Sequence, residues 1–491
     1  MLWKHNTLQE GKMKHNKAKI AIVGGGVAGS TAALYLGELG LDVTLFEKEK
    51  CLVNGPPFCH LHAGGNLYRE ISDAQCVTLL RQSIDFLRYY PFIVDYRPTV
   101  IVVPTEDKGS AADLLPRLEM LAGEYLKQIK KDPENEVLGK PETYYKVYEK
   151  GDILTLKEKN PVSTPKTLDE WMIPVAKNID LDKVQFPLIM VQEYGLNLFR
   201  LASGVTLALE SLPNVTLNTG AEVDHIEKQN NTWSVSYRQD SVESEQTFDY
   251  LINAAGFQTG HIDDMLDLKC ERMVEFKAAY VTKCDTKGIL WPEVIFHGER
   301  GTPQGMGQFT PYPGGHFQLH GMTKNITLFE DGLAVSSSHY AQPKLGSRFI
   351  DKIEKGWQAD IVQDRTQAAI AHLAHFIPNF SVAKVASKPL YGAQQIPGSD
   401  PTLRVAEVSF PLERYARCEI VKVSSVLDMI DAIVKNLIGP GYVKKSAYRS
   451  RERKHLEKLD EKVLSNYAHQ LCVTREYPVE LSDRNVKIPL N

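Results

Sequence analysis

The sequence is poor in cysteine, and its few cysteines follow no familiar spacing. Only 7 of the 491 residues are cysteine, and none belongs to a Cys-x-x-Cys pair. An odd number of scattered cysteines is typical of reduced thiols, so we expect no disulfide framework and a cytoplasmic location. Cys51 and Cys59 are close in sequence, but 7 residues separate them, a spacing that does not match the redox pair of a disulfide reductase.

Long apolar runs and a strong excess of charge are also missing. No apolar segment approaches the roughly 20 residues of a transmembrane helix, and residues 1–18 lack the apolar core of a secretion signal, so we expect a mobile tail there. The net charge of −4 predicts no general attraction to nucleic acid. With 43% hydrophobic and 24% charged residues, the chain is typical of a globular protein with two or three structural units.

The sequence does contain one stretch, Lys19–Lys48, in which short elements follow one another closely. Lys19–Val23 is an apolar, β-branched run typical of a buried parallel strand. A Gly-x-Gly-x-x-Gly turn follows at once, then helical spacing over Ser30–Leu39, then a second strand over Val43–Phe46 with Glu47 at its carboxyl end. This order predicts a strand–turn–helix–strand unit that binds an adenine dinucleotide.

The glycines of that turn each have a mechanical reason. Gly24 permits the tight turn out of the strand, Gly26 lets the backbone approach a diphosphate, and Gly29 lets the helix lie close to the sheet. The N-terminus of the helix then offers free N–H groups and the positive end of its dipole to the phosphates, and we place Val27 and Ala28 among the cofactor contacts. We expect all five residues to bind the cofactor.

The acidic end of the second strand bears on which dinucleotide is bound. Glu47 can accept hydrogen bonds from a ribose diol, and its charge argues against the 2′-phosphate of NADP. We also include Lys48 among the cofactor contacts. These residues leave FAD and NAD open, and an ordinary strand–helix–strand unit without a nucleotide is the alternative.

Further strands and helices are predicted along the rest of the chain, without internal repeats. We expect helices at Ser72–Tyr90, Ala111–Lys130, Gln192–Leu212, Gly346–Phe376 and Ser424–Leu437. We expect strands at Arg97–Pro104, Val215–Asn218, Glu222–Lys228, Thr232–Arg238, Tyr250–Ala254, Met273–Lys283, Val294–His297, His316–His320 and Leu403–Val408. Asp132–Thr167 is polar and predicted to be irregular. Tyr250–Ala254 runs into a second glycine turn, which we place beside the first, against the same dinucleotide.

In several of its motifs the chain resembles the FAD-dependent D-amino-acid oxidase-like superfamily. That superfamily includes glycerol-3-phosphate dehydrogenase, sarcosine oxidase and L-2-hydroxyglutarate dehydrogenase. The resemblance is carried by the glycine-rich stretch Gly24–Glu47, the turn Asp249–Gly256, the loop His62-Ala63-Gly64 followed by Tyr68, and the strand Phe276–Val281. In this superfamily the amino-terminal stretch binds the ADP half of FAD. The resemblance therefore favours FAD over NAD.

The resemblance implies an α/β protein with a discontinuous Rossmann-like FAD-binding domain and an inserted α+β substrate domain built on an antiparallel sheet. On this basis we assign residues 19–85, 175–272 and 385–440 to the FAD-binding domain, 86–174 and 273–384 to the substrate domain, and 441–491 to a C-terminal helical tail. It also implies further cofactor contacts at His62, Ala63, Gly64, Val223, Ala255, Gly256 and Ser424. One departure is that Ser424 and Ser425 replace the glycines that many relatives carry near the flavin.

Oxidation of a C–H bond by a flavin needs an orienting pocket and, for an alcohol, a base such as neutral histidine. His316, Gln318 and His320 alternate along one predicted strand and therefore share a face. We take His320 as the base, because it lies closest to a histidine of the 2-hydroxy-acid relatives. The alternative is that these side chains lie on the solvated face of the sheet.

Two loop residues complete the expected catalytic set. His62 is expected to contact substrate beneath the flavin, and Arg69, beside Tyr68, to bind a substrate carboxylate. A structural histidine and a surface arginine are the alternatives. Lys277 stands where relatives often carry a basic residue, with a salt bridge as the alternative. We expect no metal ion.

Together these features predict an FAD-dependent oxidoreductase, a dehydrogenase or oxidase, that transfers hydride from a small substrate to flavin and then uses an external electron acceptor. The resemblance implies a 2-hydroxy acid, an amino acid or a secondary amine, and the first is favoured by the His62 loop and His320. A flavin-dependent monooxygenase or halogenase-like enzyme and a non-catalytic FAD-binding interaction protein are the alternatives. The basic segment Lys444–Lys458 allows contact with a membrane surface, or forms a solvated helix face.

Overall fold

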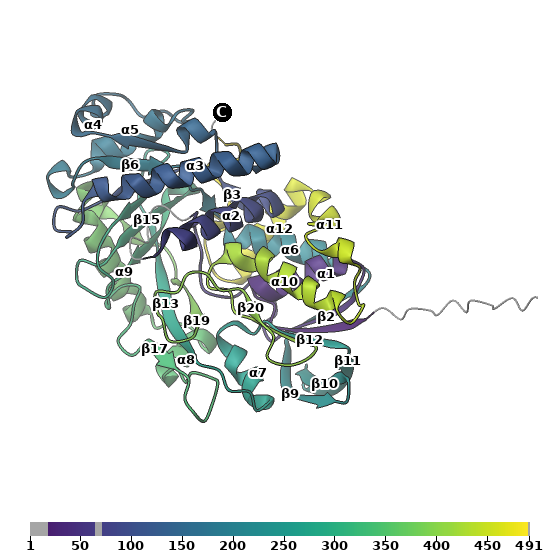
Figure 1. Ribbon diagram of the computed structural model, residues 1–491. Coiled ribbons are helices and arrows are strands. Elements are labelled where there is room, and N and C mark those ends of the chain that lie inside the picture. Colours follow the sequence, from purple (N-terminus) through teal and green to yellow (C-terminus); the bar gives the residue numbers. More distant parts are fainter. Residues whose placement is uncertain (1–17, 64–70, 490–491) are drawn as a thin grey trace, which may run out of the picture.

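The computed structural model describes residues 18–63 and 71–489, and two sheets of unequal size organise it (Figure 1). The smaller sheet has six strands in the order β20-β21-β12-β1-β2-β8, all parallel except β20. Its strands are β1 (Lys19–Val23), β2 (Asp42–Glu47), β8 (Val215–Thr219), β12 (Tyr250–Asn253), β20 (Val408–Ser409) and β21 (Tyr415–Cys418).

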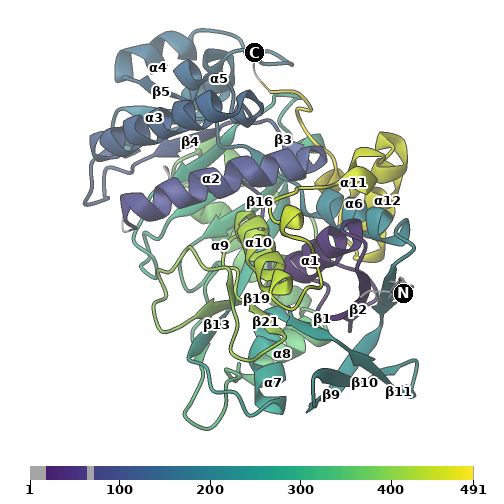
Figure 2. The ribbon, with the colours of Figure 1, turned by 45° about the vertical axis from the view of Figure 1, so that its right-hand side comes forward.

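Both faces of the smaller sheet are covered, which explains why its strands read as continuous apolar runs. Ile20 and Ile22 of β1 belong to the core that includes the helices on one face, whereas Ala21 and Val23 belong to a second core with Trp233. The helices are α1 (Val27–Glu38), α6 (Leu198–Glu210) and α10 (Val426–Ile438) (Figure 2). The second core lies against a three-stranded sheet of β9 (Ala221–Gln229), β10 (Thr232–Gln239) and β11 (Val242–Phe248).

The larger sheet has ten strands, and β13 pairs with four of them. Its strands are β4 (Thr99–Val102), β5 (Tyr145–Tyr148), β6 (Leu188–Val191), β13 (Arg272–Lys283), β14 (Glu293–Phe296), β15 (Gly307–Tyr312), β16 (His316–Gly321), β17 (Leu333–Val335), β18 (Lys384–Val385) and β19 (Leu390–Pro397). All pairs are antiparallel except β4 with β14. An α/β protein with a mainly antiparallel second sheet was predicted, and the structure confirms it.

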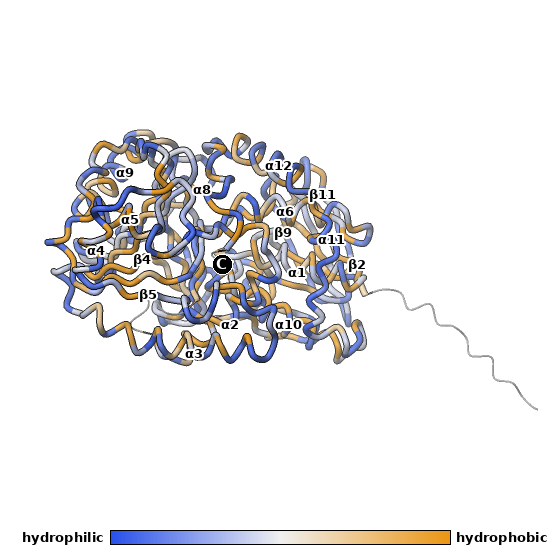
Figure 3. Tube along the Cα trace, turned by 90° about the horizontal axis from the view of Figure 1, so that it is seen from above, coloured by the Kyte–Doolittle hydropathy of each residue, from blue (hydrophilic) through white to orange (hydrophobic). Residues whose placement is uncertain are grey.

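Helices cover one face of the larger sheet. Val100, Val294 and Phe309 of that sheet share a core with Trp171 of α5 (Leu168–Asn178) and Ile370 of α9 (Ala359–Ala374), and α4 (Lys150–Lys157) joins it. The opposite face is turned toward the smaller sheet and its helices. α2 (Asp73–Tyr89) and α3 (Leu115–Lys131) lie side by side, and hydrophilic and hydrophobic residues alternate along α3 at the edge of the molecule (Figure 3).

Four element predictions need correction. Gly346–Phe376 is two helices, α8 (Ser347–Glu354) and α9, because Gly356 takes a positive φ of 90° between them. Of Leu403–Val408, only Val408 pairs, as part of β20. Asp132–Thr167 contains β5 and α4, and α6 begins at Leu198 rather than Gln192, because Asn197 caps it and accepts from the Arg200 N–H at 3.0 Å.

The sheets can be compared with the expected domain boundaries, which stay a prediction. β6 and β19 lie in the larger sheet, although the boundaries place both in the FAD-binding domain. Most of the expected tail at residues 1–18 lies outside the described residues.

The C-terminal residues pack on the body through α11 (Lys454–Glu457) and α12 (Glu461–Thr474), for example by an ion pair of 2.6 Å between Glu461 and Arg200. In the described part of the chain, no helix is long and apolar enough to cross a membrane.

Candidate active site

A cavity of about 470 Å³ lies at the carboxyl-terminal edge of the smaller sheet. It borders the ends of β1, β2 and β12, where the chain order of the strands reverses, and open α/β sheets bind their ligands at such a point. Further walls come from loop 54–57, the start of β9, the start of β19, and the C-terminal residues Arg475 and Tyr477. The cavity thus extends from the glycine turn to the larger sheet.

The three glycines of the turn have different surroundings. A Cβ on Gly29 would lie 1.8 Å from the Gly24 carbonyl oxygen, and a Cβ on Gly24 would lie 2.4 Å from the Ala254 carbonyl oxygen. A Cβ on Gly26 would meet no described atom within 4 Å, and Gly26 lies in the cavity wall at the start of α1. Gly24 and Gly29 therefore serve close packing, whereas Gly26 leaves space for a ligand at the helix N-terminus.

Glu47 lies in the same wall, at the end of β2. Its two carboxylate oxygens accept hydrogen bonds from the Gly25 N–H at 2.6 Å and the Glu49 N–H at 2.8 Å. Burial raises the pKa of Glu47, and these hydrogen bonds oppose that shift. Each oxygen keeps a free lone pair for a ribose hydroxyl. The glycine turn, the open helix end and this carboxylate fit an adenine dinucleotide.

The cavity brings together about half of the predicted cofactor contacts. Those in its walls are Gly24, Gly26, Glu47, Lys48, Val223, Ala255 and Gly256. Val27, Ala28 and Gly29 form the first turn of α1, behind Gly26. Ser424 is buried in the short turn before α10, and His62 and Ala63 lie in the loop after Pro57. Gly64, Tyr68 and Arg69 lie outside the described residues. All these cofactor and catalytic roles stay predictions.

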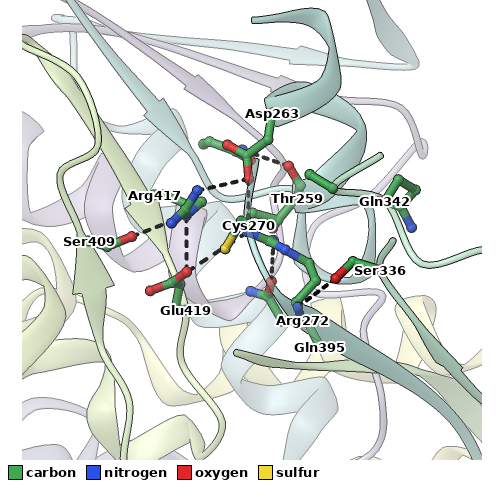
Figure 4. A network of polar contacts seen from close by, with 12 residues as sticks. Thr259, Asp263, Cys270, Arg272, Ser336, Gln342, Gln395, Ser409, Arg417 and Glu419 are labelled. Atoms are coloured by element: carbon green, nitrogen blue, oxygen red, sulfur yellow. Dashed lines mark hydrogen bonds and ion pairs between the residues drawn. The ribbon is translucent and has the colours of Figure 1, made fainter. Parts of the chain in front are cut away.

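A buried polar network supports the Ala255–Gly256 turn and joins the two sheets (Figure 4). The Asn253 side chain donates to the Tyr415 hydroxyl at 2.8 Å, which donates in turn to Asp263 at 2.8 Å. Asp263 also pairs with Arg272 of β13 at 2.8 Å and with Arg417 of β21 at 3.1 Å. The network therefore fixes the end of β12 against the larger sheet.

The face of the larger sheet that turns toward the smaller one is polar at its centre. His316 and Gln318 are 4% and 0% exposed, so the alternative of a solvated face is wrong. His320 is partly buried, and its Nδ1 atom is buried without a hydrogen-bond partner among the described residues. Gln308 pairs with His320 across β15 and β16. We call the cluster formed by His60, Glu293, Gln308 and His320 the polar face.

His60 and Glu293 form the centre of the polar face. The His60 Nδ1 atom lies 2.9 Å from a Glu293 carboxylate oxygen, and the two side chains are 3% and 0% exposed. The Gln308 amide nitrogen lies 2.6 Å from the same oxygen, and Arg97 binds the other oxygen. The opposite ring nitrogen of His60, Nε2, is buried and has no partner among the described residues. A group that is held on one side and unsatisfied on the other is suited to meet a ligand.

Of the three histidines at this site, His60 is charged, whereas His62 and His320 are neutral. Burial alone lowers the pKa of His60, but Glu293 outweighs it and raises the pKa to about 10. Burial disfavours the Glu293 carboxylate, yet His60 and Arg97 lower its pKa to about 2. Burial, with the His60 charge, lowers the pKa of His320 to about 3, and burial lowers the pKa of His62 well below its usual value.

Basic side chains lie next to the polar face. The Lys277 Nζ atom pairs with Glu275 at 2.8 Å and donates to the Gln394 side chain at 3.1 Å. Burial lowers the pKa of Lys277 and of Lys422, and Arg404 lowers both further. Lys277 pairs across β13 and β19 with Gly392, a residue of the cavity wall. A cluster of positive charge beside a cavity favours an anionic ligand.

Three potential metal ligands lie close together at the polar face. One ligand atom each from Cys59, His60 and Glu293 lies within 4.8 Å of the others. However, the Gln308 amide nitrogen lies 3.0 Å, 2.9 Å and 2.6 Å from these three atoms, so it fills the space between them. The Arg97 cation on Glu293 would also repel a metal ion. We therefore assign no metal to this cluster.

The family model for FAD dependent oxidoreductases (DAO) matches residues 19–142, which include the glycine turn and Glu47. Over these residues the chain is similar to the FAD dependent oxidoreductases of that family. The match supports FAD as the ligand of the cavity, because it covers the glycine turn and Glu47, which lie in the cavity wall. When bound, FAD would be held by Gly26, Glu47 and the turn at Ala255, and its flavin would supply the hydride acceptor.

Solved structures share the fold of this chain at low identity, and no curated protein matches its sequence. L-amino acid deaminase from Proteus vulgaris has a TM-score of 0.56 at 12% identity, over 94% of this chain and 99% of its own. L-α-glycerophosphate oxidase from Mycoplasma pneumoniae, solved with FAD bound, has a TM-score of 0.55 at 15% identity, over 86% and 94%. Glycine oxidase from Geobacillus kaustophilus has a TM-score of 0.51 at 13% identity, over 86% and 95%. These likenesses confirm the predicted fold class.

Sequence reasoning missed several residues that the structure places at the site. Glu293, Gln308 and Arg97 were not singled out, although an acidic residue at the start of an apolar strand, as in Glu293–Phe296, was a usable signal. Gly392 and Arg475 gave none, because nothing in their local sequence indicates a cavity wall.

Proposed function

We propose that the protein is an FAD-dependent oxidoreductase that oxidises a small 2-hydroxy acid at C2 and passes the electrons to an external acceptor. The observation that carries the proposal is the polar face: a charged His60 and a neutral His320 beside Lys277, with Lys277 adjacent to the cavity wall at Gly392. This arrangement offers a base, a hydrogen-bond donor and a cationic side chain close together.

The residues of the polar face have different roles in the oxidation of an alcohol. His320 is neutral, and its buried Nδ1 atom can take the proton of the substrate hydroxyl. The His60 Nε2–H, charged and held in orientation by Glu293, can donate a hydrogen bond to the substrate oxygen. When bound, the flavin would supply the acceptor for the hydride of C2, and the product would be a 2-oxo acid.

The charge of the site favours a hydroxy acid over an amino acid or amine. Arg404 and the His60 cation attract a carboxylate and repel a substrate ammonium group, and Lys277 can donate a hydrogen bond to the carboxylate. Arg69, outside the described residues, remains a further candidate for the carboxylate.

The test is anaerobic mixing of the yellow holoenzyme with 2-hydroxy acids, amino acids and secondary amines, while the flavin absorbance is followed. We expect a 2-hydroxy acid to bleach the flavin. H320N should slow bleaching by ~10²–10⁴-fold, the usual contribution of a general base. H316N, the same change on the same strand, should bleach at nearly the wild-type rate. Bleaching by amines or amino acids alone, or an H320N variant as fast as wild type, would overturn the proposal.

A further inference from the structure

The C-terminal part of the chain returns to the cofactor cavity. After α12 ends at Thr474, Arg475 and Tyr477 enter the cavity wall, where Gly26 also lies. The match to the oxidoreductase family model covers only residues 19–142, so nothing in that match assigns a role to these residues. We call Arg475–Tyr477 the C-terminal clasp.

Arg475 connects the clasp to the glycine turn. Its guanidinium donates to the Leu52 carbonyl at 2.6 Å and to the Val53 carbonyl at 3.1 Å. Val53 is a fully buried residue with a φ of 58°, a strained conformation for a β-branched side chain. The Val53 N–H donates in turn to the Gly25 carbonyl at 2.9 Å. Arg475 therefore holds a strained turn that packs directly on the glycine turn.

The clasp also holds the opposite side of the cavity. Glu476 pairs with Lys388 at 2.7 Å, and the Tyr477 hydroxyl donates to the Pro389 carbonyl at 2.8 Å. Lys388 and the neighbouring Leu390, at the start of β19, are cavity-wall residues. The three residues of the clasp thus bridge the glycine turn and the larger sheet.

Arg475 keeps a donor for a ligand. Its hydrogen bonds use Nη1 and Nη2, whereas Nε is buried and has no partner among the described residues. The guanidinium also lies 5.9 Å from the Phe199 ring centroid, a contact that restrains its plane. A planar guanidinium is well suited to a phosphate, and the open N-terminus of α1 lies on the same cavity.

We propose that Arg475 binds the diphosphate of FAD, and that the C-terminal clasp controls how long the cofactor is retained. The negative charge of the diphosphate meets the N–H groups of α1 on one side and the Arg475 guanidinium on the other. The Nε–H then gains the acceptor that it lacks, and the strained turn at Val53 is held in place.

The first experiment measures how fast FAD leaves the holoenzyme after dilution, from the rise of flavin fluorescence. R475M should release FAD ~10–100-fold faster, because hydrogen bonds to charged groups contribute about 1.5–3 kcal/mol. R484M is the matched control, because Arg484 is another partly buried C-terminal arginine, pairs with Glu461 at 3.1 Å and does not line the cavity. It should release FAD at the wild-type rate.

A second measurement separates a phosphate ligand from a structural clamp. After removal of FAD, the full chain is titrated with ADP and with adenosine, which differ by the diphosphate. R475M should weaken ADP binding ~10-fold or more while adenosine binding stays the same. Unchanged FAD release, or equal losses for ADP and adenosine, would overturn the proposal.

R475K covers the case in which R475M does not fold. It keeps the charge but loses the planar fork, so it should release FAD faster than wild type and more slowly than R475M. Retention equal to wild type would also refute the role of Arg475. None of these measurements involves a substrate. They can therefore refute the role of Arg475 without touching the proposed oxidation of a 2-hydroxy acid, and that oxidation can be refuted without touching the role of Arg475.

Discussion

The cofactor cavity and the polar face of the larger sheet differ in how their residues are distributed along the chain. The centre of the cavity is the single segment Gly24–Glu47, in which each residue type has a local reason. The polar face is assembled from His60, Glu293, Gln308 and His320, which meet only after a loop and three strands have folded together. The glycine turn and Glu47 of the cavity are thus encoded locally, whereas the polar face depends on tertiary structure.

The largest expected effect tests the local character of the cavity. G29A places a Cβ 1.8 Å from the Gly24 carbonyl oxygen, so we expect no folded holoprotein. G26A adds a Cβ that meets no described atom, so the FAD-free protein should melt at the wild-type temperature while FAD affinity falls at least ~10-fold, as expected for lost close approach to the diphosphate. Circular dichroism and flavin fluorescence provide the readouts. Equal FAD binding by G26A and wild type would place the cofactor elsewhere.

The next effect tests the tertiary assembly of the polar face. E293Q leaves His60 and Arg97 without their shared carboxylate, and breaking a buried ion pair costs about 3–5 kcal/mol in the free energy of unfolding. E243Q, an exposed residue of β11, should be nearly neutral. Urea unfolding of both variants measures the difference. An E293Q protein as stable as E243Q would show that the pair contributes nothing.

The pH dependence of that difference has a definite sign. The pKa of His60 is raised from 6.5 to about 10, so its contribution is complete below pH 6.5 and is lost as the pH rises through 10. The pKa of Glu293 is lowered from 4.5 to about 2, so its contribution is complete above pH 4.5 and is lost as the pH falls through 2. The stability gap between wild type and E293Q should therefore be greatest between pH 4.5 and 6.5 and shrink toward pH 10. A gap that grows toward pH 10 would contradict the ion pair.

The smallest expected effect is a change in KM on removing a basic side chain between the cofactor cavity and the polar face. K277M should raise the KM for the 2-hydroxy acid ~10-fold with a smaller change in kcat, because a partly screened charge contributes about 1–2 kcal/mol to anion binding. K283M, an exposed lysine at the end of the same strand, should leave both constants unchanged. Equal constants for K277M and wild type would remove Lys277 from the substrate site.

The features that could be predicted from the sequence are those that depend on local sequence, and the features that could not are those that depend on tertiary structure. The strand, glycine turn, helix and Glu47 could be read directly, because each depends on neighbours within about one turn or strand. The sequence does not decide whether Gln318 is buried, because the alternation along β16 fits a solvated face equally well. Its burial follows from tertiary packing, in which the Tyr312 hydroxyl of β15 donates to the Gln318 side chain. The ion pair of Glu293 with His60 and the return of Arg475 to the cavity join residues far apart in sequence, and no local pattern encodes such contacts.

The central claim is that the cavity holds FAD and that the adjoining polar face presents a hydroxy acid to it. The most direct test mixes the anaerobic holoenzyme with the 2-hydroxy acid that bleaches it, and with the same acid deuterated at C2. We predict that the flavin absorbance disappears with both acids and more slowly with the deuterated one, because the C2–H bond breaks in that step. A flavin that stays oxidised with every 2-hydroxy acid, while dithionite still reduces it, would contradict the account.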